Sequence, residues 1–370
     1  MREQSRAHSP ECNHERSEPM ALKTLAAPHL GPGKNVKLGR RRPISGGPRL
    51  RLGSYLKASL PPGPVAIDFS AKGQPALSNI YGNDQLGDCV IAGGYHVVAT
   101  ETGNAGRLFT ASPAQIIADY EAIGGYNPDD PSSDQGCDEP TALNYWVQNG
   151  FADGTKPLGW LAVDATNQSE LQSAMYLFEN LYFGAELPDE WVNPMPQASG
   201  FTWDAAGPPD PQNGHCVIGV GYTTQGVTID TWGLLGTLTW AALAKYCVPN
   251  VYGAAYVLLT PDQLEKGRVV APNGVAWSAL VADFDAIGGD VPFTGPSFDL
   301  TTTRGVQQAL NYLGANPVLA TDGIPGPLTR AAIENFQKDH GLTADGVVGR
   351  FTRAALQLAV TKAGSAGRQV

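Results

Sequence analysis

The chain has 370 residues, of which 42% are hydrophobic, so it can form two or three globular domains. Its net charge is −10, although residues 1–60 hold 12 Lys/Arg against 4 Asp/Glu; the acidic remainder argues against sequence-independent nucleic-acid binding. No apolar run approaches the roughly 20 residues of a membrane helix, and the first twenty residues lack the apolar core of a secretory signal. The sequence therefore does not identify the cellular location of the protein.

The basic head, residues 1–60, is rich in Pro, Gly and cationic side chains, including Arg40-Arg41-Arg42. We expect a disordered, solvated tail here. An arm that contacts an anionic surface is the alternative. Translation could start at Met1 or at Met20, because the residues between them are polar and of low complexity.

The five cysteines are odd in number and widely spaced, with no CxxC pair. This pattern predicts neither a disulfide framework nor a zinc site. An acidic loop over residues 127–139 does not have the spacing of an EF-hand and is interpreted as a solvated turn rather than a calcium site. We therefore expect no metal and no cofactor, and at least one free thiol.

Helical patterns dominate the first half of the body. A short extended run at 65–70 precedes a polar loop at 82–88, and an apolar, small-residue run from Cys89 to about 103 predicts a helix. Ser112-Pro113 is typical of a helix start, and that helix should end at Gly124-Gly125. Further helices are expected near 143–147 and 167–180, followed by a strand at 181–187.

Strand patterns dominate the second half. Residues 215–222 and 227–232 predict a hairpin around the turn 223–226, a short helix or strand follows at 238–247, and a last strand lies at 255–259. Helices first and antiparallel strands second indicate an α+β domain. Residues 263–300 are expected to be a linker with one short helical segment, 275–287.

Cys89 stands where the polar loop meets the predicted helix. Free N–H groups and the dipole at a helix N-terminus lower the pKa of a thiol and can hold a developing oxyanion. This position therefore predicts a nucleophile. The alternative is a buried cysteine of a core helix.

A histidine and a carboxylate are predicted beside it. His215 opens the first hairpin strand and Asp230 ends the second, so the hairpin could place the carboxylate next to the imidazole and fix its tautomer. His96 is interpreted as a packing residue or as a hydrogen bonder at a helix end. Cys216 is interpreted as a core residue, and Cys137 and Cys247 as structural residues.

These motifs together resemble the papain-like cysteine peptidases: Asp88-Cys89 after a Gly-containing loop, then the His215 strand, then Asp230-Thr231-Trp232-Gly233. The resemblance covers roughly residues 65–260. It implies Cys89 as nucleophile, His215 as base and acid, and Asp230 as orienter, in the place where papain carries Asn. The oxyanion-hole Gln of the family stands six residues before its Cys, where this chain has Asn83; Gln85 is only four before, so either amide could serve.

A third unit is marked by a repeat: Asp322-Gly323 and Gly326 recur as Asp345-Gly346 and Gly349, 23 positions on, each followed by a Thr that can cap a helix. The pattern strongly resembles the peptidoglycan-binding domain of bacterial and phage wall hydrolases, a small all-α module of three helices. The resemblance implies wall binding. The candidate contact residues are Asp322, Gly323, Asp345 and Gly346. The alternative is that these residues only build turns and caps.

The predicted organisation is thus a tail (1–60), a papain-like α+β domain (61–262), a linker (263–300) and a peptidoglycan-binding module (301–362). The function expected from it is a cysteine peptidase or amidase held at the bacterial cell wall, with peptidoglycan and a peptide or protein as partners. Two alternatives stay open: a non-catalytic scaffold that binds the wall, and a peptidase that acts on a protein partner.

Overall fold

The computed structural model describes residues 22–43, 50–286 and 298–349, with the pairs 352–353, 355–356 and 359–360. Its centre is an eight-stranded sheet with the order β4-β10-β5-β7-β8-β9-β6, and β3 also pairs with β7. The strands of this sheet are β3 (Ile67–Asp68), β4 (Gly159–Ala162), β5 (Leu181–Glu186), β6 (Phe201–Trp203), β7 (Gly214–Tyr222), β8 (Gly226–Thr231), β9 (Leu234–Thr239) and β10 (Ala254–Leu259). A separate hairpin joins β1 (Thr24–Ala26) and β2 (Asn35–Lys37).

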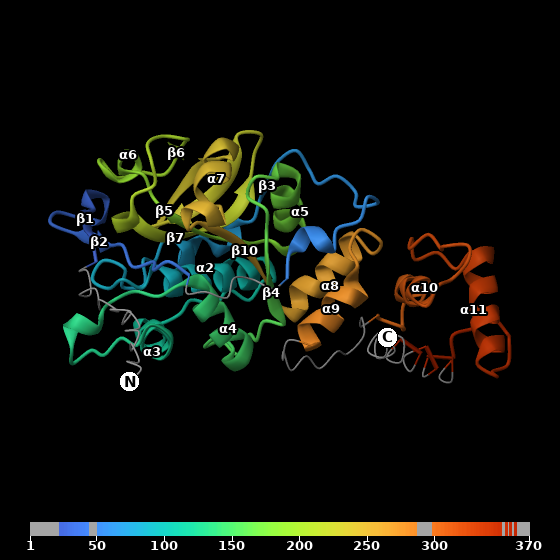
Figure 1. The fold of residues 1–370 in the computed structure, drawn as a ribbon. Coiled ribbons are helices and arrows are strands. Elements are labelled where there is room, and N and C mark those ends of the chain that lie inside the picture. The colour runs from blue at the N-terminus through green and yellow to red at the C-terminus, as the bar shows by residue number, and fades with distance from the viewer. Residues whose placement is uncertain are drawn as a thin grey trace, which may run out of the picture.

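Helices precede, cover and follow the sheet (Figure 1). They are α1 (Ser70–Leu77), α2 (Cys89–Asn104), α3 (Pro113–Gly124), α4 (Glu139–Asn149), α5 (Gln168–Phe178), α6 (Asp189–Val192), α7 (Trp240–Tyr246), α8 (Pro261–Val270), α9 (Trp277–Ala286), α10 (Thr303–Tyr312) and α11 (Pro327–Asp339). The predicted α+β order, a helical half followed by a mainly antiparallel half, is confirmed.

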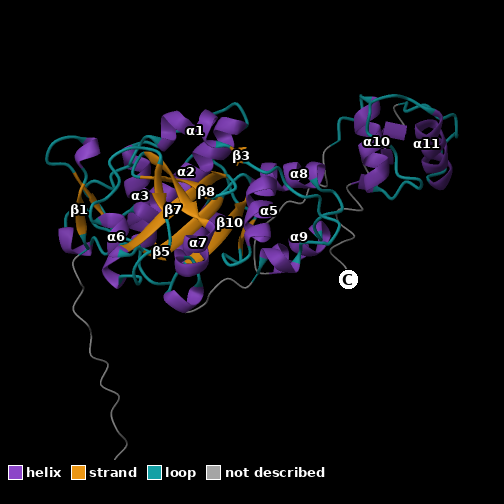
Figure 2. Ribbon diagram, turned by 90° about the horizontal axis from the view of Figure 1, so that it is seen from above, coloured by secondary structure: helices purple, strands orange, loops and turns teal. Residues whose placement is uncertain are grey.

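Two apolar cores occupy the two faces of the sheet, because side chains alternate along each strand. On β7, Val217 packs into the core beneath α5, while Cys216 and Ile218 pack into the core shared with α2. Figure 2 shows helices on both sides of the strands. The start of α2, where Cys89 lies, is thereby held against the middle of the sheet.

The predicted capping of α3 is confirmed. Ser112 and Gln115 form a reciprocal capping box, and Gly125 ends the helix at φ 73°. Capping boxes satisfy two of the free N–H groups of the first turn, so this boundary could be read directly from Ser112-Pro113.

The structure differs from the expected tail. Residues 22–43 and 50–60 are packed on the body: Val36, Leu38 and Leu52 are fully buried or nearly so, and Arg40 is buried as well. Lys37 and Arg40 of this segment form ion pairs with Asp134 and Glu139 of the body. Composition alone does not predict such long-range pairs.

The expected linker also differs. Residues 261–286 form two helices, α8 and α9, whose side chains Leu264, Trp277, Leu280 and Phe284 complete the core beneath the sheet. This segment is therefore part of the body that contains the large sheet over most of its length. Residues 287–297 lie outside the described ones.

Glu101 of α2 gives a prediction on stability. It is 3% exposed, it accepts a hydrogen bond from Thr260 at the start of α8, and burial raises its pKa to about 7. Because the folded state holds this proton more tightly, the contribution is fully present below about pH 4.5 and is lost as pH rises through 7, by about 3 kcal/mol. Denaturant unfolding followed by tryptophan fluorescence should show this loss between pH 5 and 8, and Glu101→Gln should show less of it. An equal pH dependence in both proteins would refute this assignment.

Candidate active site

Cys89 is the first residue of α2 and is only 3% exposed. Burial raises the pKa of its thiol to about 12, although the backbone N–H groups of Gly39 and Cys216 act in the opposite direction. The buried carboxyl of Asp88 adds to the rise. The expected low thiol pKa is therefore wrong for this state, because desolvation outweighs the effect of the helix N-terminus.

A small cavity brings the candidates together. It has a volume of about 20 Å³, room for about one water molecule. Its lining includes Cys89, His96, His215, Asp230, Thr231, Trp232 and Asn83. The structure thus brings the predicted nucleophile and base to the lining of one small cavity.

His215 is held by two neighbours on β8 and the turn after it. Its Nε2 lies 2.8 Å from Thr231 Oγ1, and the Trp232 ring stacks on the imidazole at 4.4 Å between centroids. Its Nδ1 is buried and has no hydrogen-bond partner among the described residues. Burial, and secondarily the charge of Arg40, lowers the pKa of His215 to about 3. The imidazole is therefore neutral, and in the tautomer in which Nε2 donates to Thr231, Nδ1 is the nitrogen that can take a proton.

Asp230 does not orient His215, contrary to the prediction. The pairing of β7 and β8 slips by one residue between Gly219 and Gly221, and beyond this bulge Asp230 stands opposite Ile218. A slip of one residue turns every following side chain to the other face of the sheet. Asp230 therefore faces α2, and Thr231 takes the place beside His215.

Asp230 pairs instead with His96. The distance from His96 Nδ1 to Asp230 Oδ2 is 3.0 Å, His96 Nε2 lies 2.8 Å from the carbonyl of Asn79, and Tyr81 packs on the imidazole. His96, expected to pack or to form a hydrogen bond at a helix end, also lines the cavity with Cys89. A sequence signal was present: position 96 follows position 89 by two helical turns and so shares its face of α2.

The two oxyanion candidates differ in placement. Asn83 is buried beside the cavity and donates to the carbonyls of Lys37 and Leu86, at 2.9 and 3.0 Å. Gln85 is exposed and is not among the residues that line the cavity. Of the two amides, only that of Asn83 is close enough to the cavity to donate to an oxyanion there, and both of its hydrogen bonds are made to backbone carbonyls.

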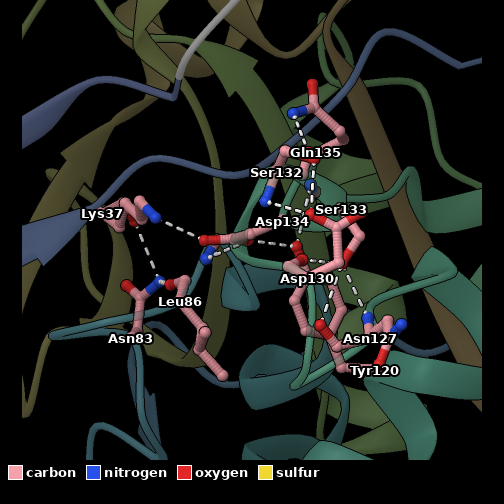
Figure 3. Close-up of polar contacts among 12 residues, drawn as sticks. Lys37, Asn83, Leu86, Tyr120, Asn127, Asp130, Ser132, Ser133, Asp134 and Gln135 are labelled. Carbon is pink, nitrogen blue, oxygen red and sulfur yellow. Dashed lines mark hydrogen bonds and ion pairs between the residues drawn. The ribbon is translucent and has the colours of Figure 1, made fainter. Parts of the chain in front are cut away.

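The N-terminal segment closes the site. The side chain of Lys37 forms an ion pair with Asp134, and the backbone N–H of Lys37 donates to the carbonyl of Asn83. The backbone of Gly39 lies directly against Gly87. A Cβ on Gly39 would fall 1.9 Å from the carbonyl oxygen of Gly87, so no other residue fits this crossing. Figure 3 shows Lys37 between Asn83 and Asp134.

Arg40 fastens the same segment. Its guanidinium and the carboxylate of Glu139 on α4 form an ion pair in which neither side chain is exposed. The terminal nitrogens of Arg40 have no hydrogen-bond partner among the described residues. The backbone N–H of Arg40 also donates to the carbonyl of Gly214, which links the segment to the residue before His215.

The acidic loop is built by its own contacts. Asp130 accepts from Ser132 and caps the turn at Pro131–Ser133, and Asp134 also accepts from Tyr120 (Figure 3). Over the described ranges, no group of three or more His, Cys, Asp or Glu side chains is arranged to hold a metal ion. No helix among the described residues is long and apolar enough to cross a bilayer.

The two Asp-Gly loops of the C-terminal module share one network. Gln307 donates to Asp322 Oδ1, to the carbonyl of Ile324 and to Thr329, and its Oε1 accepts from Gly323. Gln337 repeats these contacts on the second loop, with Asp345, Val347, Thr352 and Gly346. Backbone N–H donors, followed by the glutamines, hold the pKa of both carboxyls below the ordinary value. The predicted contact residues Asp322, Gly323, Asp345 and Gly346 are thus turn builders in this geometry.

Comparison with known proteins gives one match to a family and several to solved structures. Residues 302–356 match the family described as "Putative peptidoglycan binding domain", which confirms the predicted kinship of this module. No curated protein sequence matches the chain.

The solved structures similar to this chain include cysteine proteases, as the motif order predicted. Xylellain, a cysteine protease from Xylella fastidiosa, has 15% identity and a TM-score of 0.46 over 60% of this chain and 96% of that one. Procathepsin B S9 from Trypanosoma congolense has 13% identity and a TM-score of 0.43, over 60% of this chain and 86% of that one. Procathepsin L 3 from the midgut of Tenebrio molitor larvae has 15% identity and a TM-score of 0.42, over 59% of this chain and 76% of that one. Similarity at this level carries no chemistry, which has to come from the side chains described above.

Proposed function

We propose that this protein is a papain-like cysteine peptidase or amidase that acts at the bacterial cell wall, with Cys89 as nucleophile and His215 as base. One observation carries the proposal: Cys89 and His215 line the same cavity, and Nδ1 of His215 has no hydrogen-bond partner among the described residues while Nε2 lies 2.8 Å from Thr231 Oγ1. The C-terminal module supplies the wall contact and raises the local concentration of substrate by tethering.

In the proposed reaction, the thiol of Cys89 passes its proton to His215 Nδ1 as sulfur attacks the carbonyl carbon. The imidazolium then gives that proton to the leaving amine, and a thioester remains on Cys89. Water attacks the thioester with His215 again as base, and the acid product leaves. Thr231 Oγ1 accepts from Nε2–H throughout, which keeps Nδ1 as the nitrogen that exchanges the proton.

The oxyanion requires donors near Cys89. The N–H groups in the first turn of α2 have no partner within the helix and point toward this end. Asn83 is the second donor we assign. Its amide now donates to the carbonyls of Lys37 and Leu86, so withdrawal of the N-terminal segment would free one of its two N–H groups.

The closed cavity has a direct consequence for this function. A space of about 20 Å³ cannot admit a peptide, and the thiol and the imidazole are both neutral. We infer that a peptide reaches Cys89 once Lys37 and Gly39 withdraw from Asn83 and Gly87, the residues they contact. The same observation favours the second candidate, a non-catalytic scaffold that binds the wall, which would stay closed at all times.

Thr231→Val tests the arrangement of the base. Loss of the hydroxyl should lower kcat about tenfold with little change in KM, because one hydrogen bond of about 1.4 kcal/mol would be missing at the imidazolium. The assay follows new amino groups released from purified sacculi.

Asp230→Asn is the matched control on the neighbouring residue, and it should change kcat less. The reverse order, a large loss in Asp230→Asn and none in Thr231→Val, would return the orienting role to Asp230. No release by the wild type in any condition would favour the scaffold.

A further inference from the structure

A second cavity lies in the C-terminal module, away from both Asp-Gly loops. It has a volume of about 500 Å³, within the range of about 300–1,000 Å³ that small-molecule sites occupy. It opens between the end of α10 and the last turns of α11. Its polar lining is Asn316, Asn335, Asp339 and His340, and its apolar lining includes Leu313 and Phe336.

The internal repeat allows the cavity residues of α11 to be compared with the equivalent residues of α10, which pack in the core. Gln307 and Gln337 make the same contacts, so α10 and α11 correspond position by position. Two and three residues after Gln307 stand Ala309 and Leu310, both buried in the core. The corresponding residues of α11 are Asp339 and His340, both exposed at the cavity. A carboxylate and an imidazole therefore stand at the end of α11, where the equivalent positions of α10 hold core residues.

The lining has the chemistry of a sugar site. The rings of Phe336 and His340 stack at 4.0 Å between centroids, and His340 is the exposed member, so one aromatic face is offered outward. Asn335 and Asn316 can donate to and accept from an acetamido group, and Asp339 can accept from hydroxyls. Among the residues that the structure describes, the lining includes no Lys or Arg, which favours a neutral occupant over a polyanion.

We propose that this cavity binds an N-acetylhexosamine unit of the wall glycan, with the sugar face on His340 and the acetamido group on the asparagines. The inference rests on the proposed wall role of the protein, and it assigns that role to the cavity rather than to the Asp-Gly loops. The loops carry exposed apolar residues of their own, Ile324 and Val347, which makes them a fair comparison.

The test uses the full chain with two readouts. Titration with the tetramer of N-acetylglucosamine measures the sugar site, and sedimentation with purified sacculi measures wall retention. Asp339→Asn and His340→Ala should each weaken tetramer binding about tenfold, and the double variant should lose retention. Because His340 Nδ1 also bonds to the carbonyl of Phe336, thermal unfolding by circular dichroism must show that the helices stay folded; Asp339→Asn disturbs no such bond.

Ile324→Ala and Val347→Ala are the matched controls and should bind the tetramer as the wild type does. Equal binding by wild type and both cavity variants would overturn the inference, as would binding of a sugar-free stem peptide in place of the tetramer. If the wild type is not retained on sacculi at all, the proposed wall role fails. If it is retained and the double variant is retained equally, only the assignment to this cavity fails.

Discussion

Cys89→Ala is expected to abolish the release of amino groups from purified sacculi and to leave retention on those sacculi unchanged. Loss of a catalytic nucleophile costs on the order of 10⁶ in kcat, which puts the remaining rate below detection. Retention should persist because the matched module, residues 302–356, is distant in sequence from α2. The two readouts are measured on one preparation, so misfolding would lower both.

Cys216→Ala is the matched control, since Cys216 is also buried, free and part of the same cavity lining. It should retain most of the activity. Release that survives in Cys89→Ala would show that another group is the nucleophile. Release by neither the wild type nor any variant would leave wall binding as the whole function.

Arg40→Ala is expected to lower the free energy of unfolding by about 3–5 kcal/mol, because it leaves the carboxylate of Glu139 buried without its partner. Tryptophan fluorescence is a suitable probe. All seven Trp residues lie between positions 146 and 277, so the signal reports on the body and not on the C-terminal module. Guanidinium chloride titration of both proteins gives the difference.

The double variant Arg40→Met/Glu139→Leu separates the charge from the packing. It should recover much of the stability that Arg40→Ala loses, since apolar residues of similar volume replace a buried ion pair at little cost. A loss below about 1 kcal/mol in Arg40→Ala would mean that the segment is not held by this pair.

The sequence was most informative where a signal is local. Ser112-Pro113 marked the start of α3, and Cys89 was placed correctly at the first position of α2, because capping and turn residues act over a few positions. The choice between Asp230 and Thr231 depended on a bulge in β7. Gly219 and Gly221 permit that slip, but a glycine in a strand does not by itself predict a bulge. The sequence therefore could not show which face of the sheet Asp230 and Thr231 occupy.

The remaining differences come from long-range contacts. Residues 22–43 have the composition of a tail, and they are ordered by partners that lie about a hundred positions away, Asp134 for Lys37 and Glu139 for Arg40. The raised thiol pKa has the same origin, because the segment that excludes water from Cys89 is not its neighbour in sequence. In the C-terminal module, the repeat correctly located the two turns. The expected cap is wrong for α11: its N-cap is Gly326, and Thr329 lies within the first turn, where its hydroxyl accepts from Gln307. Pattern alone could not separate the residues that build a loop from those free to bind.

The most direct test is the rate at which iodoacetamide alkylates Cys89 as a function of pH, read by mass spectrometry of its peptide. The other three described cysteines, Cys137, Cys216 and Cys247, serve as internal standards because global unfolding would expose all four. In the wild type, all four should react slowly. In Arg40→Ala, which loosens the covering segment, Cys89 alone should react quickly near pH 6, and adding His215→Ala should move its profile toward an ordinary thiol near pH 8.5. If Cys89 never reacts ahead of the other three, or if His215→Ala leaves its profile unchanged, Cys89 and His215 do not form a catalytic pair.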